Sequence, residues 1–346
     1  MLKSAAPANN AAASHEPHTV QELVGAKPSN TKSRRVMSVA AKLAVSTVLI
    51  WLALRGVDFA SVGRHLAAAD MRMVFAGFTI TAAISLIHAD RWQVILRDIR
   101  CRVRYGIAWR WVLIGYFFNQ TLPSTVGGDA FRAWGIYRHG VPGEDAFASV
   151  VLDRVLALES LLLMMLVSLP WLFTLVRPAP ARWAVGAIIL AGALALAVLL
   201  AVTRFRRWLE PWRVTRVLVK LSSAAQQVFW RPGTLVWIVA LTIGSYALAS
   251  LVVHLLARGL GVDLPLGEAL LLVPLVTLVS VLPISIAGWG VRESAMVVAL
   301  GLIGVPAAAA FSLSVLYGLV IMATGIPGGV LWLMQRHRAA PEMNAA

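Results

Sequence analysis

The charged residues of greatest interest lie in two apolar parts of the chain that are broken by proline and glycine. The first reads NQTLPSTVGGDAFRAWGIYR, residues 119–138, and places Asp129 and Arg132 just after a proline and a Gly127-Gly128 pair. Lipid tolerates a broken backbone or a charge only where protein or a water-filled cavity surrounds it. We therefore interpret this stretch as a candidate site for a polar ligand inside a membrane protein.

A second segment repeats this pattern about 160 residues later. Both segments read L-P-x4-G-x3-R, and each is followed by Gly-Val-Pro. In the second copy the pattern ends in Gly288 and Arg292, with Glu293 directly after the arginine. Repeated, interrupted hydrophobic segments are typical of transporters that hold their substrate between two inverted halves. The repetition therefore predicts a second site-forming segment.

Arg132 and Arg292 are the main candidates for binding an anion. A charge near the bilayer centre costs about 2.5–3.5 kcal/mol on insertion scales, and an arginine near the start of a half-helix also opposes the helix dipole. A phosphate would reverse both penalties, because it can accept from a guanidinium and from the free N–H groups after Gly127, Gly128 and Gly288. The pattern thus favours a phosphate-headgroup site with both arginines in one cavity.

Internal ion pairs are the alternative interpretation of the same residues. Asp129 and Arg132 lie three residues apart, on one helix face, and Asp129 also suits the N-cap position of its half-helix. Arg292 can pair with Glu293 or with Asp153. Both interpretations hold in turn if a substrate phosphate displaces a salt bridge.

The next apolar segment, SVVLDRVLALES, carries Asp153, Arg154 and Glu159. We expect Arg154 to line the site, because a side chain in the middle of a span cannot easily reach the membrane surface. Either acid can neutralise Arg154 or carry a proton. Asn119 is expected to satisfy carbonyl groups freed by Pro123 or, alternatively, to donate to a headgroup.

Composition restricts the class of protein. The chain has 346 residues, of which 59% are hydrophobic and 14% charged, and its mean hydropathy is +0.77. It is too apolar for a soluble protein. The net charge of +15 comes from basic clusters between apolar runs, a pattern that favours anionic lipid headgroups over nucleic acid.

Cysteine and histidine usage gives no sign of a metal or another cofactor. The single cysteine, Cys101, excludes a disulfide within the chain and a cysteine-based metal cluster. His88 and His254 have no partner at metal-ligand spacing, so we expect both at membrane interfaces. We also place Arg91 and Trp92 near the cytoplasmic interface, because a cluster of arginines follows them.

The hydropathy pattern predicts an all-α, polytopic membrane bundle. Residues 1–34 are expected to be a disordered cytoplasmic tail, 35–338 the transmembrane domain and 339–346 a short tail. The basic residues put both termini in the cytoplasm, and a basic, tryptophan-bearing stretch at 205–229 is expected to lie in the interface plane. Two re-entrant hairpins are expected to enter from opposite faces as an inverted repeat, because three crossings separate them. The six full spans are expected at 36–54, 73–96, 146–170, 182–203, 234–257 and 307–334.

With these residues assembled, the chain resembles the lysylphosphatidylglycerol synthase transmembrane-region family, the flippase-like or UPF0104-type integral membrane proteins. The resemblance rests on N-x-x-L-P-x4-G-G-D-x-x-R from Asn119, on the Leu-Asp-Arg that ends at Arg154, and on P-x-S-x-x-G-x-G-x-R-E ending at Glu293. It implies a bacterial inner-membrane protein that moves or handles polar lipids. Full-length synthases also carry a soluble aminoacyl-transferase domain, which we expect to be absent here.

Three hypotheses for function follow. The first is a lipid translocator that binds a phospholipid or another polar lipid and is ATP-independent, because the sequence has no G-x4-G-K-[ST] motif. The second is a membrane enzyme acting on a lipid headgroup, with Asp129, Asp153 or Glu159 as its acid or base. The third is an accessory scaffold that binds a lipid-biosynthesis enzyme through its basic loops. We favour the first, and expect no catalytic residue.

Overall fold

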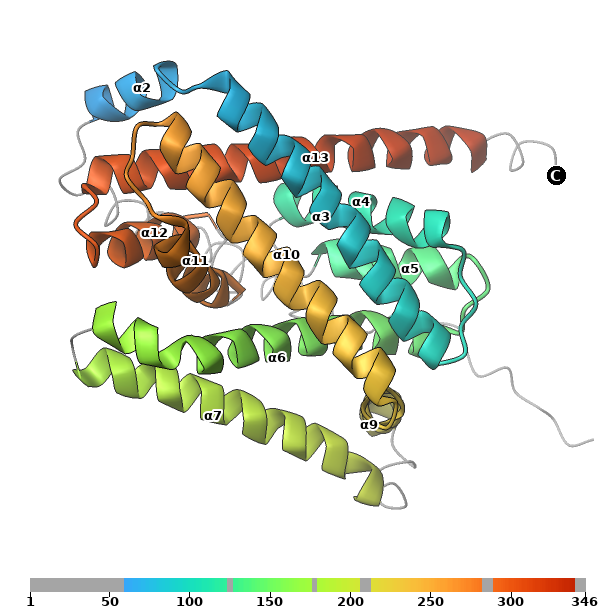
Figure 1. The fold of residues 1–346 in the computed structure, drawn as a ribbon. Coiled ribbons are helices and arrows are strands. Elements are labelled where there is room, and N and C mark those ends of the chain that lie inside the picture. The colour runs from blue at the N-terminus through green and yellow to red at the C-terminus, as the bar shows by residue number, and fades with distance from the viewer. Residues whose placement is uncertain (1–58, 123–126, 176–178, 206–212, 282–288, 340–346) are drawn as a thin grey trace, which may run out of the picture. The chain divides into compact units, whose positions relative to one another are not determined.

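The structure of the chain is a computed structural model (Figure 1). It describes residues 59–122, 127–175, 179–205, 213–281 and 289–339, all within one compact unit. These parts of the chain are helical and contain no β-strand. The expected span at 36–54 and the expected tail at 1–34 lie outside the described residues, as do Pro123, the Leu282-Pro283 pair and most of the C-terminal tail.

Five helices are long and apolar enough to cross a membrane, so the protein is a multi-pass helical membrane protein. A crossing needs about 20 apolar residues, and each of these helices coincides with one of the expected spans. The prediction of an all-α membrane bundle is confirmed. The five helices are α3 (Met71–Asp98), α6 (Gly143–Leu175), α7 (Ala179–Ala201, continued by the 3-10 turn Val202–Phe205), α10 (Pro232–Gly259) and α13 (Ala307–Ala339).

Two pairs of shorter helices lie between these spans. The first pair is α4 (Tyr105–Thr121) and α5 (Gly127–Tyr137), and the second is α11 (Leu266–Val281) and α12 (Val291–Gly301). Their members pack against each other within each pair. With 16 or 17 residues in the first helix and 11 in the second, each is shorter than the roughly 20 residues of a full crossing. They have the form expected of half-helix hairpins.

The two halves of the described chain repeat the same series of helices. The helices α3 to α6 contain 28, 17, 11 and 33 residues, and α10 to α13 contain 28, 16, 11 and 33. The first helices of the two series run antiparallel, because Gly77 near the start of α3 meets Leu256 near the end of α10, and Trp237 near the start of α10 donates to Asp90. The chain therefore enters the two hairpins from opposite ends, and the repeat is inverted.

The structure corrects the register of this repeat. Each short helix has 11 residues, and each is followed at the same spacing by Gly-Val-Pro, whose glycines Gly140 and Gly304 both have positive φ, 88° and 84°. Counted in this way, Asp129 corresponds to Glu293. Arg132 and Arg292, which the L-P-x4-G-x3-R pattern equates, lie about one helical turn apart in the repeat.

Helix α13 connects the two hairpins. Its first half packs on α11 and α12 in one hydrophobic cluster, whereas Leu331 and Trp332 in its second half pack on α4 and α5. Figure 1 accordingly shows the two hairpins near opposite ends of α13. At Gly328 a Cβ atom would overlap the carbonyl group of Leu113 in α4, so glycine at this position lets the two helix backbones touch.

Each half also begins with an amphipathic helix, and this helix packs on the last long helix of the other half. Helix α2 (Phe59–Ala67) packs on α13, and α9 (Arg213–Phe229) packs on α6. Apolar side chains of α9, including Leu221 and Ala225, are buried in a cluster with α6 and α10, so this helix covers the bundle with its apolar face. Its Lys220 Nζ lies 2.9 Å from a carboxylate oxygen of Glu144.

Candidate functional site

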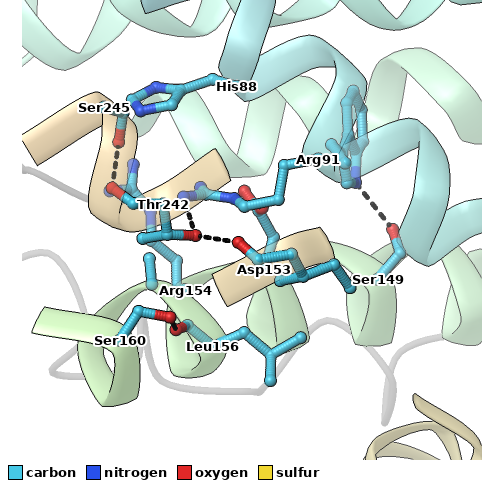
Figure 2. A network of polar contacts seen from close by, with 12 residues as sticks. His88, Arg91, Ser149, Asp153, Arg154, Leu156, Ser160, Thr242 and Ser245 are labelled. Carbon is cyan, nitrogen blue, oxygen red and sulfur yellow. Dashed lines mark hydrogen bonds and ion pairs between the residues drawn. The ribbon is translucent and has the colours of Figure 1, made fainter. Parts of the chain in front are cut away.

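Asp153 on α6 is the centre of a buried polar network. Its side chain is only 1% exposed, and its two oxygens accept hydrogen bonds from Arg91 Nε at 2.8 Å and from Arg132 Nη2 at 2.9 Å. Arg91 comes from α3 and also donates to Thr242 Oγ1 on α10 at 3.3 Å. Figure 2 shows Arg91, Asp153 and Thr242 converging from three helices. The network thus ties α5 to three membrane-spanning helices.

Asp129 on α5 extends the network with a second carboxylate. Arg154 on α6 donates to both of its oxygens, from Nε at 2.7 Å and from Nη2 at 3.0 Å. Arg132 makes a longer contact with it, 3.4 Å from Nη1. The order of contacts is therefore Arg91, Asp153, Arg132, Asp129, Arg154. The structure brings together the four charged residues that the sequence predicted for the first half of the site.

The network has an excess of positive charge when all its members are ionised, since three guanidinium groups meet two carboxylates. Such an imbalance inside membrane-spanning helices is costly unless an anion completes it. Arg132 is almost fully buried, with its guanidinium carbon 4.2 Å from the centre of the Trp92 ring. Within the described part of the chain, its Nε–H has no hydrogen-bond acceptor. The network is therefore complementary to one further negative charge.

Arg91, Trp92 and His88, which the sequence placed near the cytoplasmic interface, face the interior of the helical bundle. Arg91 and Trp92 are buried, and His88 Nδ1 lies 2.6 Å from the hydroxyl oxygen of Tyr116 on α4. The following arginine cluster suggested the interface, but the spacing 88, 91, 92 puts these residues on one helix face. That face turns inward, toward Asp153.

Asn119 and Asp129 differ from their expected local roles. Asn119 Oδ1 accepts the backbone N–H of Gly128 at 2.9 Å, so it satisfies a free donor at the start of α5 and not a carbonyl group. Asp129 lies within the first turn of α5 and uses its carboxylate for arginines, so it is not the N-cap. Gly128 itself permits close packing, because a Cβ atom there would overlap the Gly115 carbonyl oxygen.

A cavity of about 290 Å³ opens beside this network. It is lined by helices of both repeats: α3 to α6 from the first half, and α10, α11 and α13 from the second. About half of the Arg154 side-chain surface is accessible, 51%, so its charge is available to a ligand in the cavity. The predicted site residues that line the cavity are Asn119, Arg132, Asp153 and Arg154.

The predicted residues of the second half form a separate ion pair. Glu293 Oε1 lies 2.6 Å from Arg292 Nη2, and the same carboxylate accepts the backbone N–H of Gly290 at 2.5 Å and the hydroxyl of Ser314 at 3.4 Å. The Arg292 guanidinium also lies over the Trp289 ring. Neither residue is among those lining the cavity. Gly288 lies outside the described residues.

The described residues offer no obvious metal site, since no three acidic, histidine or cysteine side chains gather there. The carboxylate oxygens of Asp129 and Asp153 accept hydrogen bonds from guanidinium groups. Both side chains are therefore poor ligands for a cation.

Fold and site together define a multi-pass helical membrane protein with two inverted halves around an arginine-lined cavity. Residues 39–328 match the lysylphosphatidylglycerol synthase TM region, and the chain belongs to this family. A stretch of 85 residues is 33% identical to the UPF0104 membrane protein MJ1595 of Methanocaldococcus jannaschii. That match covers 24% of this chain and 25% of the relative.

Proposed function

We propose that the protein is an ATP-independent translocator of a polar, phosphate-bearing lipid in the bacterial inner membrane, with both termini in the cytoplasm. The observation that carries the proposal is the cavity beside three guanidinium groups and only two carboxylates. A cavity lined by both inverted halves is where transporters of this architecture hold their substrates. The headgroup would occupy the cavity, while the acyl chains stay in lipid.

The contacts suggest how a phosphate enters the network. Among the ion pairs of the buried network, the pair between Arg132 and Asp129 is the longest, at 3.4 Å. A phosphate oxygen can replace it and accept from Arg132 Nε–H, while a second oxygen accepts from Arg154. Arg91 remains paired with Asp153 throughout, so the site keeps its shape as the ligand binds and leaves.

The same contacts favour a carrier over an enzyme. A general base needs an available lone pair near the operating pH. Asp153 accepts from two arginines and Asp129 from two, so both carboxylates are engaged with guanidinium groups and not with a substrate proton. They act as counter-ions that position the arginines.

Lipid movement in proteoliposomes tests the proposal. Vesicles with acyl-labelled fluorescent phosphatidylglycerol are treated with a membrane-impermeant quencher, and the fraction quenched with time reports exchange between leaflets. We expect Arg154→Gln to slow exchange at least tenfold, the loss of one charge-assisted hydrogen bond. Arg138→Gln is the matched control, because Arg138 is exposed and packs on Trp134 outside the cavity.

Equal exchange by wild type, Arg154→Gln and empty vesicles would refute translocation. If exchange is fast in the wild type and in both variants, translocation does not need Arg154, and the proposed site is refuted.

A further inference from the structure

We infer that the cavity selects a phosphodiester lipid whose headgroup is uncharged and carries hydroxyl groups, such as glycerol or a sugar, over lipids with an ammonium headgroup. This inference rests on the proposed function and adds the class of headgroup. It depends on how charges and hydrogen-bonding groups are divided between the two repeats.

The charges favour one negative charge on the ligand. Arg91, Arg132 and Arg154 exceed their two aspartates by one, which matches a singly charged phosphodiester. Asp129 and Asp153 each already accept hydrogen bonds from two guanidinium groups, so their negative charge is already matched by arginines. An ammonium group entering this cavity would meet three cations without a free counter-ion.

The hydroxyl groups of the cavity wall present acceptors. Ser245, Thr277 and Thr324 come from the second repeat, and Thr81 comes from α3. Each donates its hydrogen to a backbone carbonyl within its own helix, at 2.7, 2.8, 2.7 and 2.7 Å respectively. A hydroxyl group that has donated its hydrogen retains lone pairs for accepting. The wall therefore suits a headgroup rich in O–H donors.

Gln120 adds an unsatisfied amide to this wall. It lines the cavity from α4, and its Oε1 atom is buried without a hydrogen-bond partner among the described residues. A buried amide without a partner costs about 1–3 kcal/mol, and a ligand hydroxyl removes that cost because it can both donate and accept. The Nε–H of Arg132 needs an acceptor, and the Oε1 atom of Gln120 needs a donor. The two residues can therefore bind different parts of one headgroup.

Each common headgroup meets these features differently. A glycerol or sugar phosphodiester supplies the negative charge and the hydroxyl donors. A choline headgroup has no donor for Gln120 or the hydroxyl oxygens, and it adds a positive charge. An ethanolamine or aminoacyl headgroup has donors, but its ammonium group faces the three arginines. We therefore expect phosphatidylglycerol to be preferred over all three.

The first experiment compares headgroups on the wild-type protein. Proteoliposomes receive, in trace amount, one acyl-labelled lipid at a time: phosphatidylglycerol, phosphatidylcholine, phosphatidylethanolamine or lysyl-phosphatidylglycerol. We expect phosphatidylglycerol to exchange about tenfold faster than phosphatidylcholine, which corresponds to one charge and one hydrogen bond. Binding of short-chain, soluble forms of the same lipids, measured by tryptophan fluorescence, should follow the same order.

The second experiment removes one acceptor at a time. Gln120→Leu and Thr81→Val should each reduce phosphatidylglycerol exchange about threefold to tenfold and leave phosphatidylcholine exchange unchanged. Thr79→Val is the matched control for Thr81→Val, because Thr79 makes the same kind of bond, to the Phe75 carbonyl at 2.9 Å, but is exposed outside the cavity. Thermal unfolding in detergent verifies that each variant is folded, and Thr324→Val replaces any that is not.

The outcomes distinguish this inference from the proposal on which it rests. No exchange of any lipid would overturn the proposed function. Exchange of all four lipids at one rate, or an ammonium lipid exchanging fastest, would overturn the headgroup inference and leave translocation standing. A preference for phosphatidylglycerol that survives both Gln120→Leu and Thr81→Val would also overturn it, because these residues would not be the source of selectivity.

Discussion

The hairpins α4–α5 and α11–α12 have nearly the same lengths and the same position in their repeats, but they use their acidic residue differently. In the first, Asp129 is paired with Arg154 from the neighbouring long helix, beside a cavity. In the second, the equivalent acid, Glu293, is paired with the residue next to it, Arg292, and Gly318 stands where the first half has Arg154. The Arg292 guanidinium packs against that glycine.

The difference shows that a repeated backbone need not repeat a site. The second hairpin neutralises its own acid locally, so it is complete without a ligand. The first draws in arginines from other helices and is left with one charge too many. The repeat position of Asp153 is occupied by Tyr317, which lines the cavity as a neutral residue. The first half supplies the charges of the cavity, and both halves supply neutral polar groups to its wall.

The largest expected effect distinguishes the two equivalent positions on the long helices. Asp153→Asn leaves Arg91 and Arg132 buried without their counter-ion and should lower the free energy of unfolding by about 3–5 kcal/mol. Tyr317→Phe, at the equivalent position, should change it by less than about 1 kcal/mol. Denaturant unfolding in detergent micelles measures both. Similar losses for the two variants would mean that the halves are energetically alike.

The next prediction concerns the ion pair of the second hairpin. Arg292→Met leaves Glu293 buried and unpaired, at a cost of about 3 kcal/mol, and the double variant Arg292→Met/Glu293→Gln should recover most of it. Lipid exchange per folded molecule should stay at the wild-type rate in the double variant. If exchange is lost while stability recovers, Arg292 belongs to the binding site and the comparison fails.

A smaller effect is expected at Gly318. In Gly318→Ala the new Cβ atom would overlap the Arg292 guanidinium, and this overpacking should cost about 1–3 kcal/mol. Gly186→Ala in α7 is the control, because nothing lies within 4 Å of its Cβ position. Thermal unfolding should show a loss only for the first. Equal unfolding temperatures for the two variants would argue against close packing of the Arg292 guanidinium on Gly318.

The smallest effect is expected at α9, the amphipathic helix that packs on α6. Lys220 lies outside the five spans, and its hydrogen bond to Glu144 raises its pKa above the ordinary value. A raised lysine pKa gives stability below the unfolded pKa, about 10.4, that is lost as the pH rises through the folded pKa. Because the pair is partly exposed, Lys220→Met should cost only about 0.2–1 kcal/mol at pH 7. A variant that unfolds at the wild-type temperature at pH 7 and pH 9 would show that the pair contributes nothing.

Much of the fold could be predicted from local patterns. Hydropathy located the spans because each is a long apolar helix, and the Leu-Pro and glycine breaks located both hairpins. The inverted repeat followed from the odd number of crossings between them. The register did not, because the matching arginines lie at different depths in α5 and α12, whereas Gly140 and Gly304 mark equivalent positions.

The site was less predictable, because its pairing is set by tertiary packing. Sequence spacing suggested Asp129 with Arg132 and Arg292 with Glu293, and both contacts exist. The dominant partners, Arg91 for Asp153 and Arg154 for Asp129, come from other helices. Counting positive charges placed Arg91 near the cytoplasmic interface and did not reveal its partner, although the helix face that it shares with His88 and Trp92 was a readable sign of burial.

The glycine contact between α13 and α4 has a mechanical consequence. Backbones that touch at Gly328 and Leu113 cannot slide past each other without a clash, so these two helices should travel as a single rigid strut. Movement that opens the cavity to either leaflet must then come from helices that lack such a backbone contact. Disulfide pairs engineered across α4 and α13, in a chain whose only native thiol is Cys101, should leave lipid exchange intact.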